Sequence, residues 1–146
     1  MASTTVWKSI AAGAAGACAL TLLHEATRRV VPHAPRMDIM GMRGIAATMR
    51  AAGQTPPSKL HGTALVTDLV FNTAYYSAVG AAGRDNALLT GSLLGLGAGI
   101  GAVVLPQPLG LGVGPSDRTR ATQAMTVGLY TRGGLFAAVA YRAFDE

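Results

Sequence analysis

Four long stretches of the chain are almost free of charge, and short charged or proline-rich segments separate them. Residues 6–23 carry one charged side chain, 60–83 carry one, 86–105 carry none and 119–144 carry three arginines. A helix of about 20 apolar residues crosses roughly 30 Å of hydrocarbon. The pattern predicts an all-α, polytopic membrane protein with one integral membrane domain (1–146). Its four transmembrane helices are predicted at about 6–31, 60–83, 86–105 and 119–144.

The composition favours a bilayer over a soluble core. Hydrophobic residues make up 50% of the chain, charged residues 13%, and glycine occupies 19 positions. An ordinary soluble domain carries charge on about a quarter of its residues. Buried helices of a soluble protein are the alternative, but four apolar stretches in so short a chain leave too little polar surface to cover them.

A different periodicity follows the prolines that end the first stretch. Over residues 37–52, Met42, Ile45 and Met49 fall on one side of a helix. Another side carries three arginines at seven-residue intervals: Arg36, Arg43 and Arg50. The pattern predicts a short amphipathic helix between spans one and two, lying on the membrane surface with these arginines in contact with anionic lipid head groups.

Lysine and arginine are distributed unevenly between the two sides that four spans would define. The loop 28–59 and the segment near Asp117 hold most of them, whereas the termini and the turn after Gly83 hold three. The positive-inside rule therefore places the long 28–59 loop in the cytoplasm and both termini outside.

Glycines recur at helical spacing in two of the predicted spans. The third span has one at every fourth position, Gly91, Gly95 and Gly99, and the first has Gly13 and Gly16 among alanines. Stripes of small residues let helix backbones approach closely inside a membrane. We expect these glycines to pack on neighbouring helices of the same chain or of another one, in a homo-oligomer or as a subunit of a larger membrane complex.

Charged and polar side chains inside the predicted spans are costly there and often mark functional sites. Counting about 1.5 Å per residue from the cytoplasmic side places His24 and Asp68 at matching depth. Arg132 lies deeper, but its side chain leans back toward the level of Asp68. The predicted intramembrane polar cluster consists of His24, Glu25, Asp68, Asn72 and Arg132. Whether Asp68 pairs with Arg132 depends on the order of the helices.

Glu25 also has a simpler explanation. Arg28 and Arg29 follow it by three and four residues, which is the favourable order for an ion pair along a helix. This local pairing accounts for Glu25 without any chemistry, and we prefer it to a catalytic role. His24 has no such explanation and is the better functional candidate.

Two segments resemble a known kind of protein. "LLHEATRRVVPHAPRMDIMGMRG" is similar to a pattern found in small uncharacterised bacterial multi-pass inner-membrane proteins, and "ATQAMTVGLYTRGG" is similar to their last helix. The resemblance covers about the first third and the last fifth of the chain. It implies a bacterial inner-membrane location and carries over no activity.

Motifs of familiar enzyme classes are missing from the sequence. "HEATR" has Arg28 where the second histidine of HExxH would stand, and no GxSxG, CxxC or P-loop occurs. We therefore assign no catalytic residue and expect no cofactor.

Metal and nucleic-acid binding are also disfavoured. Met37, Met40 and Met42 have the spacing of thioether ligands in soft Cu(I) sites, but they are explained as flexible apolar anchors of the surface helix, so no metal site is expected. The net charge of +5 could suggest nucleic acid, yet no aromatic platform accompanies the arginines. Lipid phosphates are the expected anions, and nucleic acid is not an expected partner.

Three classes of function remain. The preferred one is a non-catalytic integral membrane subunit or scaffold that packs against other transmembrane helices and anionic lipid. The alternative is a small oligomeric channel or transporter with a polar intramembrane site around Asp68 and Arg132. The third is a membrane enzyme acting on lipid, with His24 as a general base.

Overall fold

The structure is a computed structural model that describes the backbone of residues 2–144 and the side chains of residues 5–144. Over this range every regular element is helical, which confirms the all-α prediction. The surface helix predicted at 37–52 is also present as a helix. The elements in chain order are α1 (Ala2–Val30), α2 (Met37–Ala51), α3 (His61–Ser77), the 3₁₀ helix η1 (Ala78–Ala82), α4 (Gly83–Val104) and α5 (Arg120–Phe144).

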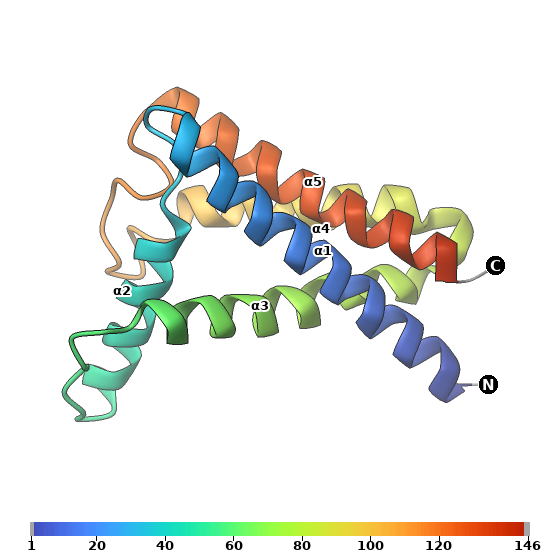
Figure 1. Ribbon diagram of the computed structural model, residues 1–146, viewed down its shortest axis with the longest axis horizontal. Coiled ribbons are helices and arrows are strands. Elements are labelled where there is room, and N and C mark those ends of the chain that lie inside the picture. The colour runs from blue at the N-terminus through green and yellow to red at the C-terminus, as the bar shows by residue number, and fades with distance from the viewer. Residues whose placement is uncertain (1, 145–146) are drawn as a thin grey trace.

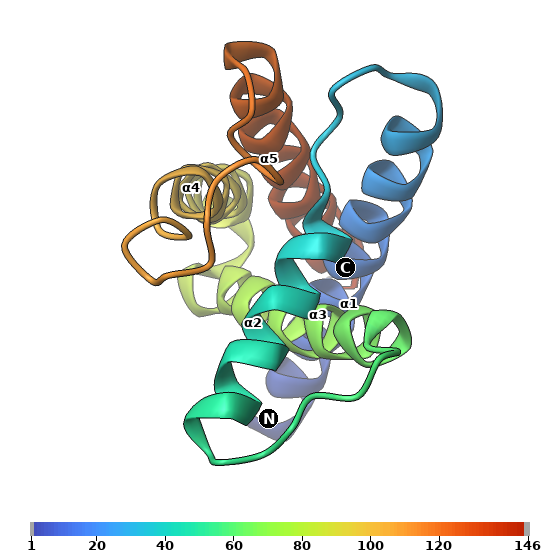
Figure 2. The ribbon, with the colours of Figure 1, turned by 90° about the vertical axis from the view of Figure 1, so that its left-hand side faces the viewer.

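α3 and α4 run along the long axis of the molecule, α1 and α5 are inclined to them, and α2 crosses one end (Figure 1). α5 packs between α4 and α1, and α3 packs on α1. Both ends of the described chain and η1 lie at one end of the bundle, whereas α2 and the loop 105–119 lie at the other (Figure 1). Figure 2 shows this second end face on, with α2 running across α3. We call it the α2 end.

Two helical stretches, Thr5–Val30 and His61–Val104, are long and apolar enough to cross a membrane. The second turns back on itself at η1, so it comprises the antiparallel helices α3 and α4 (Figure 1). α5, predicted as a further span, does not meet the same standard because Arg132, Gln123 and its threonines lower its mean hydropathy. Length and composition thus support two candidate spanning stretches, not four separate ones.

Glycines allow close contact between α4 and α5. Gly91, Gly95 and Gly99 all lie on the face of α4 that meets α5, and all three are buried. A Cβ atom at Gly91 would overlap the carbonyl oxygen of Gly134, and one at Gly95 would lie 2.5 Å from the carbonyl oxygen of Tyr130. Any larger residue at these positions would therefore force the two backbones apart.

Small residues of α1 serve the same purpose on its two sides. A Cβ at Gly13 would overlap the backbone of α3 at Thr73, and a Cβ at Gly16 would lie 2.7 Å from the carbonyl oxygen of Gly133 in α5. α1 is therefore held between α3 and α5 at close range, as the sequence pattern predicts for packing stripes.

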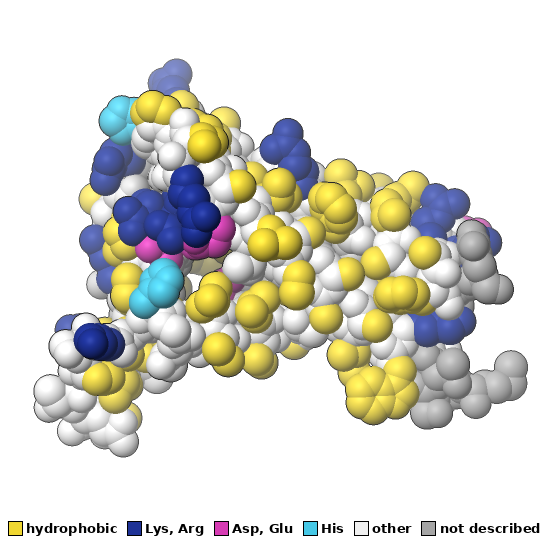
Figure 3. Space-filling view, viewed as in Figure 1, with side chains coloured by type: hydrophobic (Ala, Val, Ile, Leu, Met, Phe, Trp, Pro, Cys, Tyr) yellow, Lys and Arg dark blue, Asp and Glu magenta, His cyan; other side chains and the backbone are white. Residues whose placement is uncertain are grey.

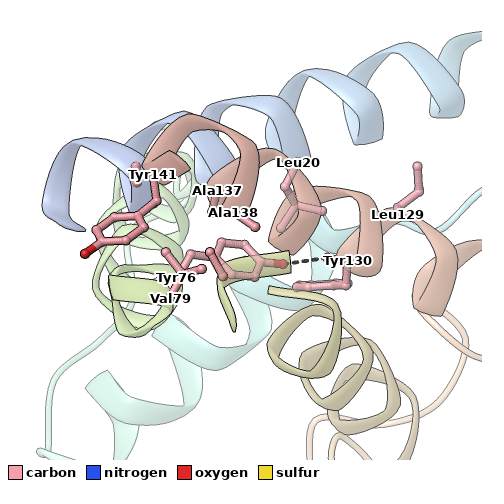
Figure 4. Close-up of a cluster of buried hydrophobic side chains, with 10 residues drawn as sticks. Leu20, Tyr76, Val79, Leu129, Tyr130, Ala137, Ala138 and Tyr141 are labelled. Carbon is pink, nitrogen blue, oxygen red and sulfur yellow. Dashed lines mark hydrogen bonds between the residues drawn. The ribbon is translucent and has the colours of Figure 1, made fainter. Parts of the chain in front are cut away.

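The core combines three tyrosines with smaller aliphatic side chains. Tyr76 is completely buried and its hydroxyl donates a hydrogen bond of 2.8 Å to the carbonyl oxygen of Tyr130 (Figure 4). This bond joins α3 to α5, two helices that otherwise touch little. Leu20 and Val79 belong to the same buried cluster, which also contains Leu129, Tyr130, Tyr141 and four alanines. Tyr76 is thus a large, fully buried group of α3 that contacts α5.

Hydrogen bonds connect the two loops at the α2 end. The Thr122 hydroxyl donates to the carbonyl oxygen of His33 over 2.7 Å, and the Arg36 amide donates to the carbonyl oxygen of Pro115 over 2.7 Å. His33 has a φ of 58°, in the left-handed region that few non-glycine residues adopt. The turn after α1 is therefore fixed against the start of α5 and the loop 105–119.

Candidate polar cavity at the α2 end

A small cavity lies between α1, α2 and α3, with a volume of about 30 Å³. Figure 3 shows acidic, basic and histidine side chains gathered around a hollow at the α2 end, while most of the remaining surface on this face is apolar or uncharged. The apolar wall of the cavity includes Met37, Ala64 and Leu65. The polar side chains that line it are Thr21, His24, Glu25, Asp38, His61 and Asp68.

The cavity brings together most of the polar cluster expected from the sequence. His24, Glu25 and Asp68 line it, and Asn72 lies one turn beyond Asp68 on the same helix, α3. The matching depth of His24 and Asp68 therefore corresponds to a shared site.

Arg132 does not belong to this site. Its side chain is exposed, and no ion pair joins it to an acidic group within the described part of the chain. Gly133 faces Leu20 of α1 and Gly134 faces α4, so the preceding position points away from both helices. The cluster forms without Arg132, because the glycines decide which face of α5 is turned inward.

Thr21, Asp38 and His61 line the cavity but are absent from the predicted cluster. Helical spacing was the available signal for two of them, since Thr21 precedes His24 by three residues and His61 precedes Asp68 by seven. Asp38 offered no such signal, because it reaches the cavity only through the placement of α2 against α3.

Two of the three cavity carboxylates are paired with arginines. Arg28 donates two hydrogen bonds to Glu25, at 2.8 and 2.6 Å, and Arg36 donates two to Asp38, at 2.9 and 2.7 Å. Such two-pronged arginine–carboxylate bonds are among the stronger polar contacts in proteins. Asp68 forms no ion pair among the residues that the structure describes. It is therefore the carboxyl group whose charge no side chain offsets.

His24 presents an unused lone pair in the same region. Its Nδ1 lies 3.2 Å from the carbonyl oxygen of Leu20, which can only accept, so Nδ1 carries the proton and Nε2 is an acceptor. Nε2 is buried without a hydrogen-bond partner, and so is the Oγ1 atom of Thr21 one turn earlier. The Tyr130 ring fixes the imidazole from the side, with ring centres 5.5 Å apart. Buried polar atoms are rarely left unpaired, so both atoms are candidates to bind a polar ligand.

The pairing of Asp38 with Arg36 has a consequence for acid stability. The Arg36 guanidinium holds the pKa of Asp38 below its usual range. A group whose folded pKa is depressed stabilises the fold above its unfolded pKa of about 3.9, and this contribution is lost as the pH falls through the folded value.

We expect Asp38→Asn to lower the melting temperature at neutral pH and to have progressively less effect as the pH falls to about 2, because the wild-type carboxylate is then protonated as well. The measurement is thermal unfolding of both proteins across this range. Glu25 and Arg28 lie close to Asp38 but are the same in both proteins, so the difference reports Asp38. A difference in melting temperature that does not change with pH would contradict a stabilising ion pair between Arg36 and Asp38.

The three arginines predicted to contact lipid head groups differ in their surroundings. Arg36 holds Asp38, and Arg43 donates to the carbonyl oxygens of Leu111 and Val113 at 3.0 and 3.4 Å. Arg50 is exposed and has no hydrogen-bond or ion-pair partner among the described residues. Arg43 and Arg50 both line a groove of about 390 Å³ between α2 and the loop 105–119. Contact with lipid phosphates is therefore open to Arg50 without loss of a protein contact.

No group of three or more histidine, cysteine, aspartate or glutamate side chains in the described residues is arranged to hold a metal ion. The chain matches no family model, no curated protein and no solved structure in the three comparisons made with known proteins. The resemblance to small bacterial membrane proteins therefore rests on the quoted segments alone.

Proposed function

We propose that the protein is an integral membrane protein in which α1, α3, α4 and α5 cross the bilayer and α2 lies at its cytoplasmic surface. On this proposal it acts as a non-catalytic membrane subunit or scaffold in a bacterial inner membrane, bound to other helices and to anionic lipid. The observation that carries it is the apolar outer surface of the bundle. Phe71 is 72% exposed, Val70 61% and Leu93 59%, and each lies in the middle part of its helix.

The low burial of the long helices supports a lipid environment. Only 28% of the most apolar window in Thr5–Val30 and 22% of that in His61–Val104 is buried inside the protein. The core helix of a soluble protein passes the same test of length and hydropathy but is mostly buried. Exposed apolar surface on this scale is rare in soluble monomers and indicates a lipid or protein partner.

The position of α5 explains why it can span the bilayer with a lower hydropathy. α4 covers one of its faces and α1 another, so only part of its surface would meet lipid. Its buried hydroxyl groups have internal partners: Thr122 bonds His33, and Thr126 bonds the carbonyl oxygen of Ser116. Polar groups that are paired within the protein cost little inside a membrane.

A scaffold fits this geometry better than a channel does. The polar cavity is confined to the α2 end, and the buried core beside it contains Leu20, Tyr76 and Val79, which leave no polar path along the bundle. The alternative of a small oligomeric transporter keeps one supporting observation, the unpaired Nε2 of His24 in the cavity. For a lipid-acting enzyme, no hydroxyl or thiol group among the described residues is hydrogen-bonded to His24.

Accessibility of single cysteines tests the membrane placement. Cys18 is the only cysteine of the sequence and lies exposed on α1. In sealed membranes we expect a membrane-impermeant maleimide to leave Cys18 unlabelled from either side, because lipid covers that face, and to label it after solubilisation in a denaturing detergent. Labelling is measured by the mass shift of the purified protein.

Two variants in a Cys18→Ala background test whether the chain crosses more than once. Ser58→Cys lies in the connection before α3, and Asp85→Cys lies at the start of α4, at opposite ends of the bundle; both positions are exposed. We expect them to react from opposite sides of the membrane, with Ser58→Cys reacting from the cytoplasmic side. Reaction of both from the same side, or labelling of Cys18 in intact membranes, would contradict the proposed topology.

The subunit role has its own test. Native mass spectrometry of protein released from nanodiscs should show either a multiple of the chain mass or a complex with another membrane protein. A lone chain under these conditions, together with solute flux in liposomes that Asp68→Asn abolishes, would replace the scaffold proposal by the transporter alternative.

A further inference from the structure

We propose that the cavity between α1, α2 and α3 binds a primary ammonium group, R–NH₃⁺, through His24, Thr21 and Asp68. The site is independent of the scaffold role. The placement of the chain in a membrane matters only for the source of the amine, which is either a lipid head group or a free amine.

Three residues that line the cavity carry hydrogen-bond acceptors and form no ion pair among the described residues. His24 is 9% exposed and its Nε2 is a buried lone pair without a partner; the Oγ1 atom of Thr21 is likewise buried and unpaired. Both residues line the cavity, three positions apart on α1. Asp68 faces them from α3 and supplies carboxylate oxygens. An ammonium group has three N–H donors and no acceptor, which matches this set of partners.

The charge of the site selects a cation. Arg28 and Arg36 already neutralise Glu25 and Asp38 through paired hydrogen bonds, whereas Asp68 has no ion-pair partner among the described residues. An anionic guest would therefore meet an uncompensated carboxylate. A cationic donor would offset this charge and pair the two orphaned atoms of α1 at the same time.

The size of the cavity excludes bulky cations. A volume of about 30 Å³ accommodates one or two water-sized groups. The NH₃⁺ end of a primary amine is of this size, whereas three methyl groups on the nitrogen would both overfill the space and remove every donor. The site should therefore discriminate between primary and quaternary ammonium groups.

Arginines next to the cavity favour a lipid as the source of the amine. Arg28 and Arg29 both contact Glu25, and the Arg29 side chain is 72% exposed and so can reach a further anion. A phosphoethanolamine head group carries a phosphate two carbons from its ammonium. The ammonium would enter the cavity while the phosphate meets Arg29, a contact of the kind that arginine makes well.

Binding of methylammonium to the detergent-solubilised protein tests the site directly. We expect methylammonium chloride to raise the melting temperature in a saturable way and tetramethylammonium chloride at the same concentration to leave it unchanged. Asp68→Asn should weaken methylammonium binding by about tenfold or more, the loss expected for a hydrogen bond to a charged group. Thr21→Val, which keeps shape and charge, should weaken it by a smaller factor.

Asp85→Asn is the matched control, because it removes the same charge from an exposed position at the other end of the bundle. It should bind methylammonium as the wild type does. Circular dichroism shows whether each variant is folded, and Thr21→Val keeps the test valid if Asp68→Asn is not. Equal stabilisation by both ammonium salts, or unchanged binding in both cavity variants, would overturn the proposal and leave a cavity filled by water.

Experiments in nanodiscs show whether the bound amine is a lipid head group or a free amine. Protein released from bilayers of phosphatidylethanolamine and phosphatidylglycerol should retain phosphatidylethanolamine in native mass spectra, and protein from matched phosphatidylcholine bilayers should retain no zwitterionic lipid. Methylammonium binding without this preference would support the site with a free amine as its ligand. The detergent experiment needs no bilayer, so it remains decisive even if the cysteine labelling contradicts the proposed topology.

Discussion

Gly134→Val is expected to separate α4 from α5 and to cost about 3 kcal/mol or more of folding free energy. A Cβ atom at Gly134 would overlap the carbonyl oxygen of Gly91 and would lie 3.0 Å from the amide nitrogen of Gly95. Both obstacles are backbone atoms, which cannot rotate away as a side chain can. The measurement is the melting temperature or denaturant midpoint of the purified protein in a mild detergent.

Gly128→Ala provides the matched control on the same helix. A Cβ at Gly128 would have no atom within 4 Å, apart from its own helix. Alanine is a better helix former than glycine by up to about 1 kcal/mol, so this variant should be as stable as the wild type or slightly more stable. Equal destabilisation by both substitutions would show that the effect comes from α5 itself and not from its contact with α4.

Tyr76→Ala should destabilise the protein by about 3–5 kcal/mol, as expected when a large buried aromatic side chain is removed from a core. The alanines around it cannot fill the space, and the hydrogen bond to the Tyr130 carbonyl is lost as well. Tyr76→Phe removes only the hydroxyl and should cost about 1 kcal/mol. Unfolding measurements on the three proteins therefore separate packing from hydrogen bonding.

The adjacent tyrosine is a control for the Tyr76→Phe result. The Tyr75 hydroxyl donates to the carbonyl oxygen of Leu94 over 2.9 Å, but this side chain is 40% exposed. Tyr75→Phe should cost less than Tyr76→Phe because the Tyr75 side chain is only partly packed against the rest of the protein. A larger effect at Tyr75 would mean that the contact between α3 and α4 outweighs the one between α3 and α5.

The helices could be predicted from the sequence because their local signals agree. Apolar stretches, prolines after α1 and the periodicity of residues 37–52 predict the α-helices to within a few residues, except that the helix expected at 60–83 is α-helical only to Ser77 and continues as η1. The fold of residues 60–105 was also accessible, since the glycine at position 83 has a φ of 72° and permits the reversal between α3 and α4. Hydropathy does not identify α5 as a spanning helix. Its neighbours α1 and α4 cover part of its surface, and the sequence of α5 alone does not show this.

The sequence predicts those residues of the candidate site whose position follows from their depth along a helix. Counting residues from one end of each helix gives His24 and Asp68 the same depth, and the two residues do line one cavity. The depth of Arg132 along α5 does not show on which face of the helix it lies. That face depends on which glycines of α5 contact α1 and α4. Asp38 was missed for a similar reason, since no local pattern shows that α2 folds back over α3.

The hydrogen bonds at the α2 end have a consequence for the order of folding. Thr122 and His33 are separated by 89 positions in the chain, and Arg43 and Leu111 by 68. Contacts so distant in sequence form late, because the intervening chain must lose entropy before they can be made. The helical hairpin of α3 and α4 requires no such closure and can assemble early. During synthesis, α2 can therefore pack on α3 first, whereas its bond to Leu111 and the bond between Thr122 and His33 form only after the loop 105–119 and α5 have been made.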